Sequence, residues 1–185
     1  GEPKYQEQFD KATNDIAAVA RRTAGNDKVM VLQGESATRA AVVKAFESLR
    51  TRTKAADSFA VVLVGHGSFD GDTYKFNLPG PDIDGAELKR LLGAVPAKSQ
   101  LVVNATSASG AVLDALATDG RAVITATRSG FERNATRFAE LFAAAIAEGA
   151  ADINKNGVIT AQEAFDYASR SVRSEEHTSE LQSLR

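Results

Sequence analysis

The side chains with the clearest chemical potential follow two short apolar runs of the sequence. The first run, 59–64, leads into His66-Gly67, and the second, 99–104, is followed by two serines, Ser107 and Ser109. A histidine can act as a general base, and a serine hydroxyl becomes a nucleophile when such a base takes its proton. If the two runs are neighbouring parallel strands, both loops lie at the carboxyl edge of one sheet, where open α/β sheets bind their ligands. The sequence therefore predicts a site that contains His66 and the hydroxyls of Ser107 and Ser109, and the helix expected after these serines would offer backbone amides to an anion.

The spacing of apolar residues predicts the elements that position this site. Apolar residues three and four positions apart indicate helices, and short β-branched runs bounded by glycine indicate buried strands. The expected helices cover residues 4–21, 36–49, 84–92, 111–117 and 133–148. The expected strands cover residues 28–32, 59–64, 99–104 and 121–126. This order predicts an α/β protein with three layers, α/β/α, around a mainly parallel sheet.

Local signals add detail to this scheme. Ser36 and Asp84 precede apolar helical patterns and are expected to cap their helices. The segment 73–78 is expected to form a small edge hairpin or an extended arm, which the prolines after it would end. Helix 4–21 has no strand in front of it, although crossovers connect one parallel strand to the next. We therefore expect an upstream strand in the natural protein that this sequence lacks.

The two site segments carry a resemblance to a known family. An apolar strand that ends in His66-Gly67, and a second strand whose loop closes on a Ser-Gly pair, resemble the caspase-like fold of clan CD. Within this fold, the chain is most similar to the legumain-type cysteine peptidases and their bacterial relatives. The resemblance covers about residues 25–148 and implies that His66 is the general base. It also implies that Ser107 occupies the position of the nucleophilic cysteine.

The sequence departs from that family at the nucleophile. The family pattern has an acidic residue, an alanine and the catalytic cysteine where this chain has Ala105, Thr106 and Ser107. A thiol is partly ionised near neutral pH, whereas a serine hydroxyl needs a well-oriented base to react. Ser107 is therefore expected to be a poor nucleophile, and the chain contains no cysteine that could replace it.

Three interpretations of this site stay open. In the first, His66 is a turn residue, and Ser107 and Ser109 cap a helix. In the second, which we favour, the domain is a pseudo-peptidase with a binding or regulatory role toward a peptide or protein ligand. In the third, it is an active hydrolase in which His66 activates Ser107, and a cysteine changed to serine by engineering or mis-sequencing would also explain this residue. The resemblance places a wall of the specificity pocket at Arg128 and Ser129, and the Arg128 guanidinium suits a carboxylate.

A second chemical pattern lies near the end of the chain. The twelve residues 152–163 match the EF-hand calcium loop, with oxygen ligands, a glycine and an apolar residue at the expected positions. The expected calcium ligands are Asp152, Asn154, Asn156, the Val158 carbonyl, Thr160 and Glu163. Because only two of these side chains are charged, we expect weak affinity, toward ~10⁻⁴ to 10⁻³ M. Alternatively, Thr160 and Glu163 form a capping box that only starts a helix.

Composition and the end of the chain set further bounds. The formal net charge of −2 gives no indication of a nucleic-acid ligand, and no apolar run is long enough to span a membrane. We expect an α/β domain at 1–150 and the calcium-type loop with its exiting helix at 151–172. The codons permitted by Arg173–Ser183 can be written as a common sequencing adapter, so 173–185 is expected to be non-native, the alternative being a genuine polar helix. The calcium-type loop favours an exported bacterial protein, and nothing in the sequence indicates an oligomeric state.

Overall fold

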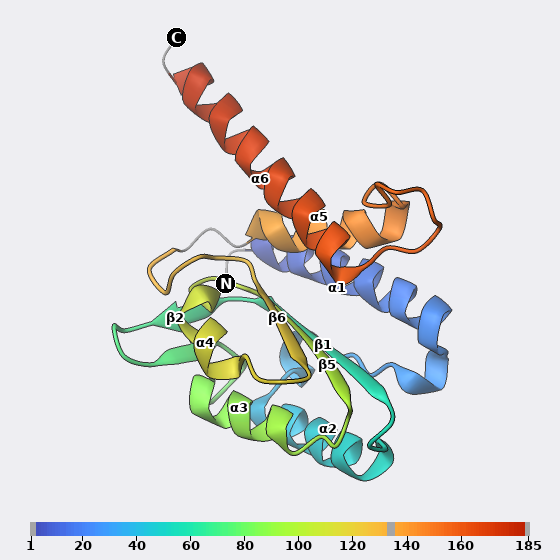
Figure 1. Cartoon of the computed structure of the whole chain (residues 1–185). Helices are drawn as coiled ribbons and strands as arrows, with labels where there is room; N and C mark the ends of the chain where they lie inside the picture. The colour runs from blue at the N-terminus through green and yellow to red at the C-terminus, as the bar shows by residue number, and fades with distance from the viewer. Residues whose placement is uncertain (1–2, 133–135, 184–185) are drawn as a thin grey trace. The chain divides into compact units, whose positions relative to one another are not determined.

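A parallel sheet of three strands lies within the region Met30–Ala135 (Figure 1). Its strands are β1 (Ser58–Gly65), β5 (Ser99–Thr106) and β6 (Arg121–Thr125), in the order β1-β5-β6. The middle strand, β5, is buried from Val102 to its end because it has a neighbour on each side. The predicted α/β class and mainly parallel sheet are confirmed, and these three strands begin and end within two residues of their expected positions.

The computed structural model describes residues 3–132 and 136–183, which fall into two compact units. One unit is Met30–Ala135, and it contains the sheet. The other combines Gly1–Val29 with Thr136–Arg185. Both ends of the expected domain 1–150 therefore belong to the same unit as the loop 152–163.

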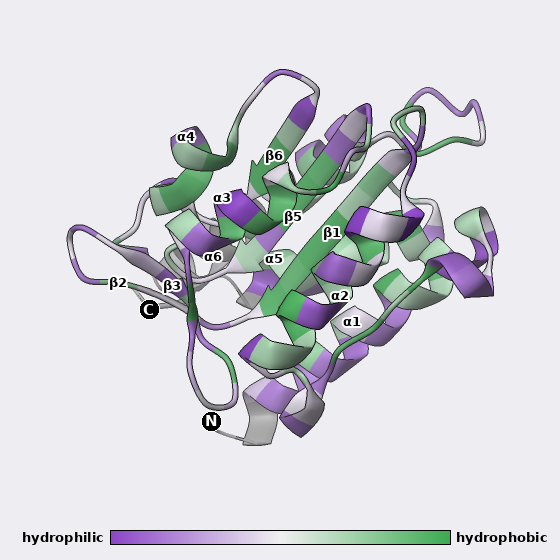
Figure 2. Cartoon of the chain, turned by 90° about the horizontal axis from the view of Figure 1, so that it is seen from below, coloured by the Kyte–Doolittle hydropathy of each residue, from purple (hydrophilic) through white to green (hydrophobic). Residues whose placement is uncertain are grey.

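Two helices pack against one face of the sheet. These helices are α2 (Arg39–Arg52) and α3 (Gly85–Gly93), and in Figure 2 they lie in front of the apolar strands. Their buried side chains join those of β1 and β5 in one core, because each helix carries apolar residues along a single face. The fully or nearly fully buried members from these four elements are Phe46, Leu63, Leu88, Leu91, Leu92 and Val102.

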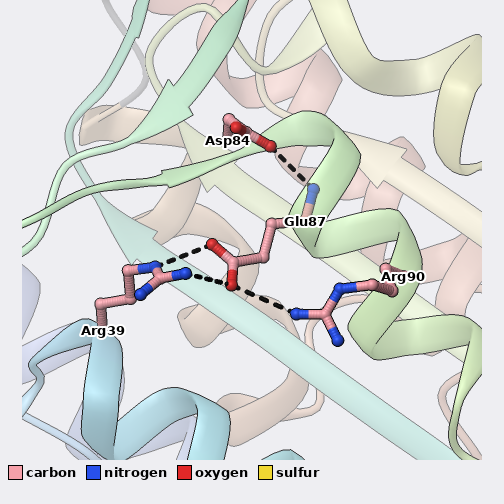
Figure 3. A network of polar contacts seen from close by, with 4 residues as sticks. All are labelled: Arg39, Asp84, Glu87 and Arg90. Atoms are coloured by element: carbon pink, nitrogen blue, oxygen red, sulfur yellow. Dashed lines mark hydrogen bonds and ion pairs between the residues drawn. The ribbon is translucent and has the colours of Figure 1, made fainter.

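A bidentate ion pair joins α2 to α3 (Figure 3). Arg39 donates Nε to Glu87 Oε2 at 2.8 Å and Nη2 to Glu87 Oε1 at 2.7 Å, and Arg90 donates to the same Oε1 at 3.3 Å. The hydrogen bonds and charge of Glu87 raise the pKa of Arg39 above its usual value. Asp84 caps α3 as predicted, since its carboxylate accepts from the Glu87 amide at 2.7 Å. The ion pair thus fixes α2 beside the capped start of α3.

The segment between β1 and α3 forms a small antiparallel sheet. Its strands are β2 (Gly67–Phe69), β3 (Tyr74–Phe76) and β4 (Ile83–Asp84). The pairing of β2 with β3 is the hairpin that was one of two forms expected near 73–78. After β5, the expected helix 111–117 is observed as a 3-10 helix, η3 (Ser109–Val112), that continues into α4 (Leu113–Leu116).

The strand predicted at 28–32 is not formed. A short 3-10 helix, η1 (Asn26–Lys28), occupies its start, and the following residues up to Gln33 pair with no described strand. Met30 is 43% exposed and Leu32 is 37% exposed. A short run of apolar residues was the basis of the prediction, but a strand also needs a neighbour that takes its backbone hydrogen bonds.

The helix after this segment begins later than predicted. Ser36, the expected cap, lies in a second 3-10 helix, η2 (Gly34–Ser36), and its hydroxyl donates to the Gln33 carbonyl at 2.7 Å. Thr38 caps α2 instead, since its Oγ1 accepts from the Ala41 amide at 3.2 Å. Ser36 and Thr38 are both of a residue type that caps helices. Because Ser36 lies inside the 3-10 helix η2, α2 begins after Thr38.

The unit formed by the two chain ends is helical. Its helices are α1 (Pro3–Ala24), α5 (Thr136–Glu148) and α6 (Ala161–Ser183), and α5 packs against both of the others. The expected helices at 4–21 and 133–148 are confirmed, except that 133–135 lie outside the described residues. The helix α6 continues through 173–183, and its helical state does not test whether that segment is native. Within the described ranges, no helix combines the length and apolar character needed to cross a membrane.

Candidate functional site

The carboxyl ends of β1 and β5 bring His66 and Ser107 to one edge of the sheet. The two strands pair in parallel register up to Gly65 opposite Thr106. His66 and Ser107 are the next residues along these two strands, and neighbouring strands lie about 4.8 Å apart. The parallel arrangement therefore places the expected base and the expected nucleophile side by side on the backbone.

Gly67 lies directly against the backbone that carries Ser107. A Cβ atom at Gly67 would overlap the Ser107 carbonyl oxygen, and it would lie 2.7 Å from Thr106 Oγ1 and 2.9 Å from a ring carbon of Tyr74. No side chain can be accommodated there without moving one of the two loops. A glycine is required at this position by close approach of the two loops.

Two further glycines join a third loop to the first two. A Cβ at Gly110 would overlap the backbone between Arg128 and Ser129, and a Cβ at Gly130 would overlap the ring of Phe69. The segments 66–69, 107–110 and 127–132 therefore touch one another, and we call them the three site loops. Each contact is made at a glycine, so the loops approach more closely than side chains would permit.

Ser107 stands on a sharp turn at the end of β5. It is half-buried, and the next residue, Ala108, has a left-handed backbone with φ 57°. This conformation is strained for a residue other than glycine, and such strain is concentrated at functional sites. The Ala108 amide donates to the Glu132 carbonyl at 2.8 Å, which ties the turn to the third site loop.

Two buried residues, Ser109 and Thr127, stabilise the Ser107 turn through hydrogen bonds. The two hydroxyls lie 3.2 Å apart, and Thr127 Oγ1 accepts from the Gly110 amide at 2.9 Å. The amides of Ala108 and Gly110 are thus already bound within the protein. The expected anion site at a helix start is corrected accordingly, because these two amides are taken and the helix that follows is only a short 3-10 turn.

A buried polar network lies under the site loops. Tyr74, Asn104 and Thr106 are each at most 2% exposed, and the Tyr74 hydroxyl lies 2.6 Å from Thr106 Oγ1 and 3.1 Å from Asn104 Nδ2. Burial raises the pKa of Tyr74 above its usual value, so its hydroxyl stays protonated. Thr106 also donates to the Ser107 carbonyl at 3.1 Å. The network thus supports the end of β5 where Ser107 begins the turn, and the sequence analysis did not identify it.

The other predicted site residues lie around this turn. His66 is exposed, and its carbonyl accepts from the Asn77 amide at 3.1 Å. Arg128 is exposed, and no side chain in the described ranges pairs with its guanidinium. The hydroxyl of Ser129 contacts a carboxylate oxygen of Glu132 and the Phe131 amide, each at 3.4 Å, so it shapes the loop. Among the described residues, Arg128 therefore offers at this edge a cationic side chain that no other side chain neutralises.

The loop 152–163 turns its polar side chains inward. The Asp152 carboxylate accepts from the amides of Asn156 at 3.1 Å and Gly157 at 2.8 Å, and Asn156 Oδ1 accepts from the Val158 amide at 2.8 Å. Gly157 has φ +80°, a left-handed turn that favours glycine. Asn154 Nδ2 donates to Glu163 Oε1 at 2.8 Å, so the two ends of the loop meet.

The capping box predicted at the end of this loop is present. Glu163 Oε2 accepts from the Thr160 amide at 2.9 Å, and Thr160 Oγ1 accepts from the Glu163 amide at 3.2 Å. Capping and calcium binding use the same two residues, so this contact does not decide between them. In the described ranges, no group of three or more His, Cys, Asp or Glu side chains could hold a metal ion. The 152–163 loop contributes only two such side chains, and its remaining expected oxygen donors are two side-chain amides, the Val158 carbonyl and the Thr160 hydroxyl.

Two surface hollows are lined by residues outside the three site loops. One of about 230 Å³ is lined by Lys75, Asp82 and Asp84. The other, of about 430 Å³, lies beside the Arg39–Glu87 ion pair. The carboxylates of both hollows already accept hydrogen bonds from the protein, so neither hollow indicates a ligand.

Comparison of the chain with protein-family models, curated proteins and solved structures found no match. No relative therefore supplies a function. The function of this chain is therefore inferred from the three site loops and from the loop 152–163.

Proposed function

We propose that the three site loops bind a peptide or protein segment, in a caspase-like, legumain-type domain that has lost catalysis. The observation that carries this proposal is the contact of Gly67 with the Ser107 carbonyl at the carboxyl edge of a parallel sheet. It puts the His-Gly segment and the turn at the nucleophile position together, as the resemblance in sequence implies. The resemblance further implies a three-layer α/β/α architecture.

An extended ligand suits this edge better than an enclosed small molecule. His66 and Arg128 are exposed, and neither of the two hollows described above includes a residue of the three site loops. The Arg128 guanidinium can donate two parallel hydrogen bonds to a carboxylate. The ligand is therefore a peptide with an acidic side chain.

The surroundings of Ser107 disfavour catalysis. A serine needs a base held in the correct orientation, and Ala105 replaces the acidic residue that the family pattern has two positions before the nucleophile. Acyl transfer also needs amides that stabilise the developing oxyanion. The Ala108 and Gly110 amides are already bound to Glu132 and Thr127, respectively, which reduces the donors at this turn.

The alternative function is an active hydrolase. In that case His66 would take the Ser107 proton as Ser107 Oγ attacks the peptide carbonyl, and the peptide C–N bond would break as His66 passes that proton to the leaving amine. Water, deprotonated by His66, would then attack the acyl ester, and its C–O bond would break to release the carboxylic acid and return the proton to Ser107. If a cysteine at position 107 was changed to serine, the residues around it would be the same and the activity would have been lost with the thiol. Cleavage of aspartyl, asparaginyl or arginyl peptides that disappears in His66→Ala would support the hydrolase and contradict the pseudo-peptidase.

The proposal predicts binding without turnover. We expect fluorescence anisotropy to show binding of an aspartyl peptide, and chromatography of the same peptide to show no cleavage products. Arg128→Ala should weaken this binding by about 10- to 100-fold, because a hydrogen bond to a charged group contributes about 1.5–3 kcal/mol. Arg50→Ala removes another exposed arginine of the same unit and should leave the affinity unchanged. Equal affinities of the Arg128 and Arg50 variants would contradict the proposed role of Arg128.

We propose as a second function that the loop 152–163 binds calcium. The residues fit this ion because calcium takes oxygen ligands, and Asp152, Asn156 and Glu163 direct side-chain oxygens into the loop. Glu163 Oε1 would exchange its hydrogen bond from Asn154 Nδ2 for the ion, and Asn154 would bind through Oδ1. Val158 and Thr160 would supply the remaining oxygens. With two charged ligands, the ion would have a structural role at millimolar concentrations.

Calcium titration followed by NMR tests this second function. We expect the Gly157 amide signal to shift with a dissociation constant toward ~10⁻⁴ to 10⁻³ M. Glu163→Gln should abolish the shift. The start of α6 should be unchanged in this variant, because glutamine also closes a capping box. Glu148→Gln, an exposed change outside the loop, should bind calcium like the unaltered chain. A loop that shows no shift at millimolar calcium is only a capped turn.

A further inference from the structure

An exposed aromatic pair lies at the rim of the three site loops. Phe131 is 75% exposed, and its ring meets the ring of Phe69 edge to face with centroids 5.4 Å apart. Phe69 is half-buried and packs against the core of its unit. Phe131 is the most exposed of the large hydrophobic side chains in the described ranges, and it stands three residues after Arg128.

The structure holds Phe131 in this exposed position. The Ala108 amide binds the carbonyl of Glu132 at 2.8 Å, and the Phe131 amide donates to Ser129 Oγ at 3.4 Å. Gly130 lies directly against the Phe69 ring, so the two rings are brought together by the backbone. The loop that presents Phe131 is thus fixed on both sides of it, next to the Ser107 turn.

We propose that Phe69 and Phe131 form a subsite for a bulky apolar side chain of the bound peptide, beside the carboxylate that Arg128 takes. This inference rests on the proposed function, and it narrows the ligand to acidic peptides with a large apolar residue nearby. Three residues of chain span at most about 10 Å, so Arg128 and Phe131 are within reach of one short segment. In an extended peptide, side chains two residues apart point to the same side. The apolar residue therefore lies within two positions of the acidic one.

The chemistry of the pair fits an aromatic or large aliphatic side chain. Phe69 covers one part of the Phe131 ring, and the rest is open to solvent. An apolar side chain placed there would remove this surface from water and, if aromatic, would add a further ring contact. Arg128 would at the same time neutralise the charge of the neighbouring carboxylate.

Paired peptides and variants test the subsite. The probes are fluorescein-labelled peptides with one aspartate and a phenylalanine two positions before or after it, and their counterparts with alanine in place of that phenylalanine. We expect loss of the phenylalanine to weaken binding to the unaltered chain by about three- to tenfold for at least one of the two orders. The same change should have no effect on binding to Phe131→Ala, whereas Phe131→Leu should keep most of the preference. Leu113→Ala, another exposed apolar residue of the same unit, should behave like the unaltered chain.

The outcomes separate this inference from the proposed function. If aspartyl peptides bind but Phe131→Ala binds both members of each pair as the unaltered chain does, the subsite is wrong and peptide binding stands. If no peptide binds, both are wrong. If size-exclusion chromatography shows a dimer that Phe131→Ala dissociates, while peptide affinity is unchanged, the pair is a contact between two copies of this chain and the inference is overturned.

Discussion

Gly67→Ala is expected to lower the free energy of unfolding by about 1–3 kcal/mol and to abolish peptide binding at the edge. The new methyl group would overlap the Ser107 carbonyl oxygen and crowd Thr106 and Tyr74, whose hydroxyls hydrogen-bond to each other in the interior. Either β2 or the Ser107 turn must move, and each movement breaks contacts between the site loops. Urea denaturation followed by circular dichroism measures the stability, and anisotropy with the aspartyl peptide measures the binding.

Gly93→Ala is the matched control for this change. Gly93 is the last residue of α3, and apart from its chain neighbours and the backbone of its own helix, no atom lies within 4 Å of a Cβ placed there. An alanine there should be neutral, or should stabilise the helix by up to about 1 kcal/mol. If Gly67→Ala unfolds at the same urea concentration as Gly93→Ala and still binds peptide, the two loops do not make the contact on which the proposed site depends.

The elements that carry the site were predictable because their signals are local. β1 and β5 are short β-branched runs that end at glycine or small residues, and the helical spacing between them requires a crossover. Parallel pairing follows from that crossover. With the pairing given, His66 and Ser107 have to reach the same edge.

The predictions that were wrong concern features that depend on which other residues lie beside the segment. Residues 28–32 contain the short apolar run of a strand, but no described strand lies beside them to take their hydrogen bonds. Ser36 and Thr38 are both suitable caps, and the 3-10 turn that ends at Ser36 decided for Thr38. The anion site was expected at the helix start after β5. Two amides at that turn are not available to an anion, because the Gly110 amide donates to Thr127 Oγ1 and the Ala108 amide donates to the Glu132 carbonyl, and both acceptors are distant in sequence.

The features that sequence could not supply are contacts between distant residues. Arg39 and Glu87 are 48 residues apart, and Tyr74 and Thr106 are 32 apart. Neither pair has a motif of its own. The three glycine contacts also appear only when the loops are placed together. A signal did exist for Phe131, since an aromatic residue close to Arg128 in a polar loop needs an explanation, but the sequence does not show that its ring meets Phe69.

The second large effect is expected from Ser107→Cys. The chain has no cysteine, so this variant carries a single thiol whose reactivity can be followed without background. An imidazole beside a thiol stabilises the thiolate and lowers the pKa of the thiol from about 8.5, by more than a unit in paired sites. We therefore expect Ser107→Cys to ionise near neutral pH, because the strand register places His66 beside position 107.

A variant of a distant serine controls for burial and for the reagent. Ser48 is also half-buried, and it lies on α2 away from the three site loops. The thiol of Ser48→Cys should titrate near the ordinary value of about 8.5. Circular dichroism of each variant confirms that the fold is retained before the rates are compared.

The pH dependence of iodoacetamide alkylation of Ser107→Cys, with and without His66→Ala, tests the site most directly. We expect a midpoint at or below about pH 7.5 for Ser107→Cys, which returns to about 8.5 when His66 is replaced by alanine. A midpoint of about 8.5 that is the same with and without His66 would contradict it. In that case His66 and Ser107 would be neighbours along the sheet edge that do not form one site.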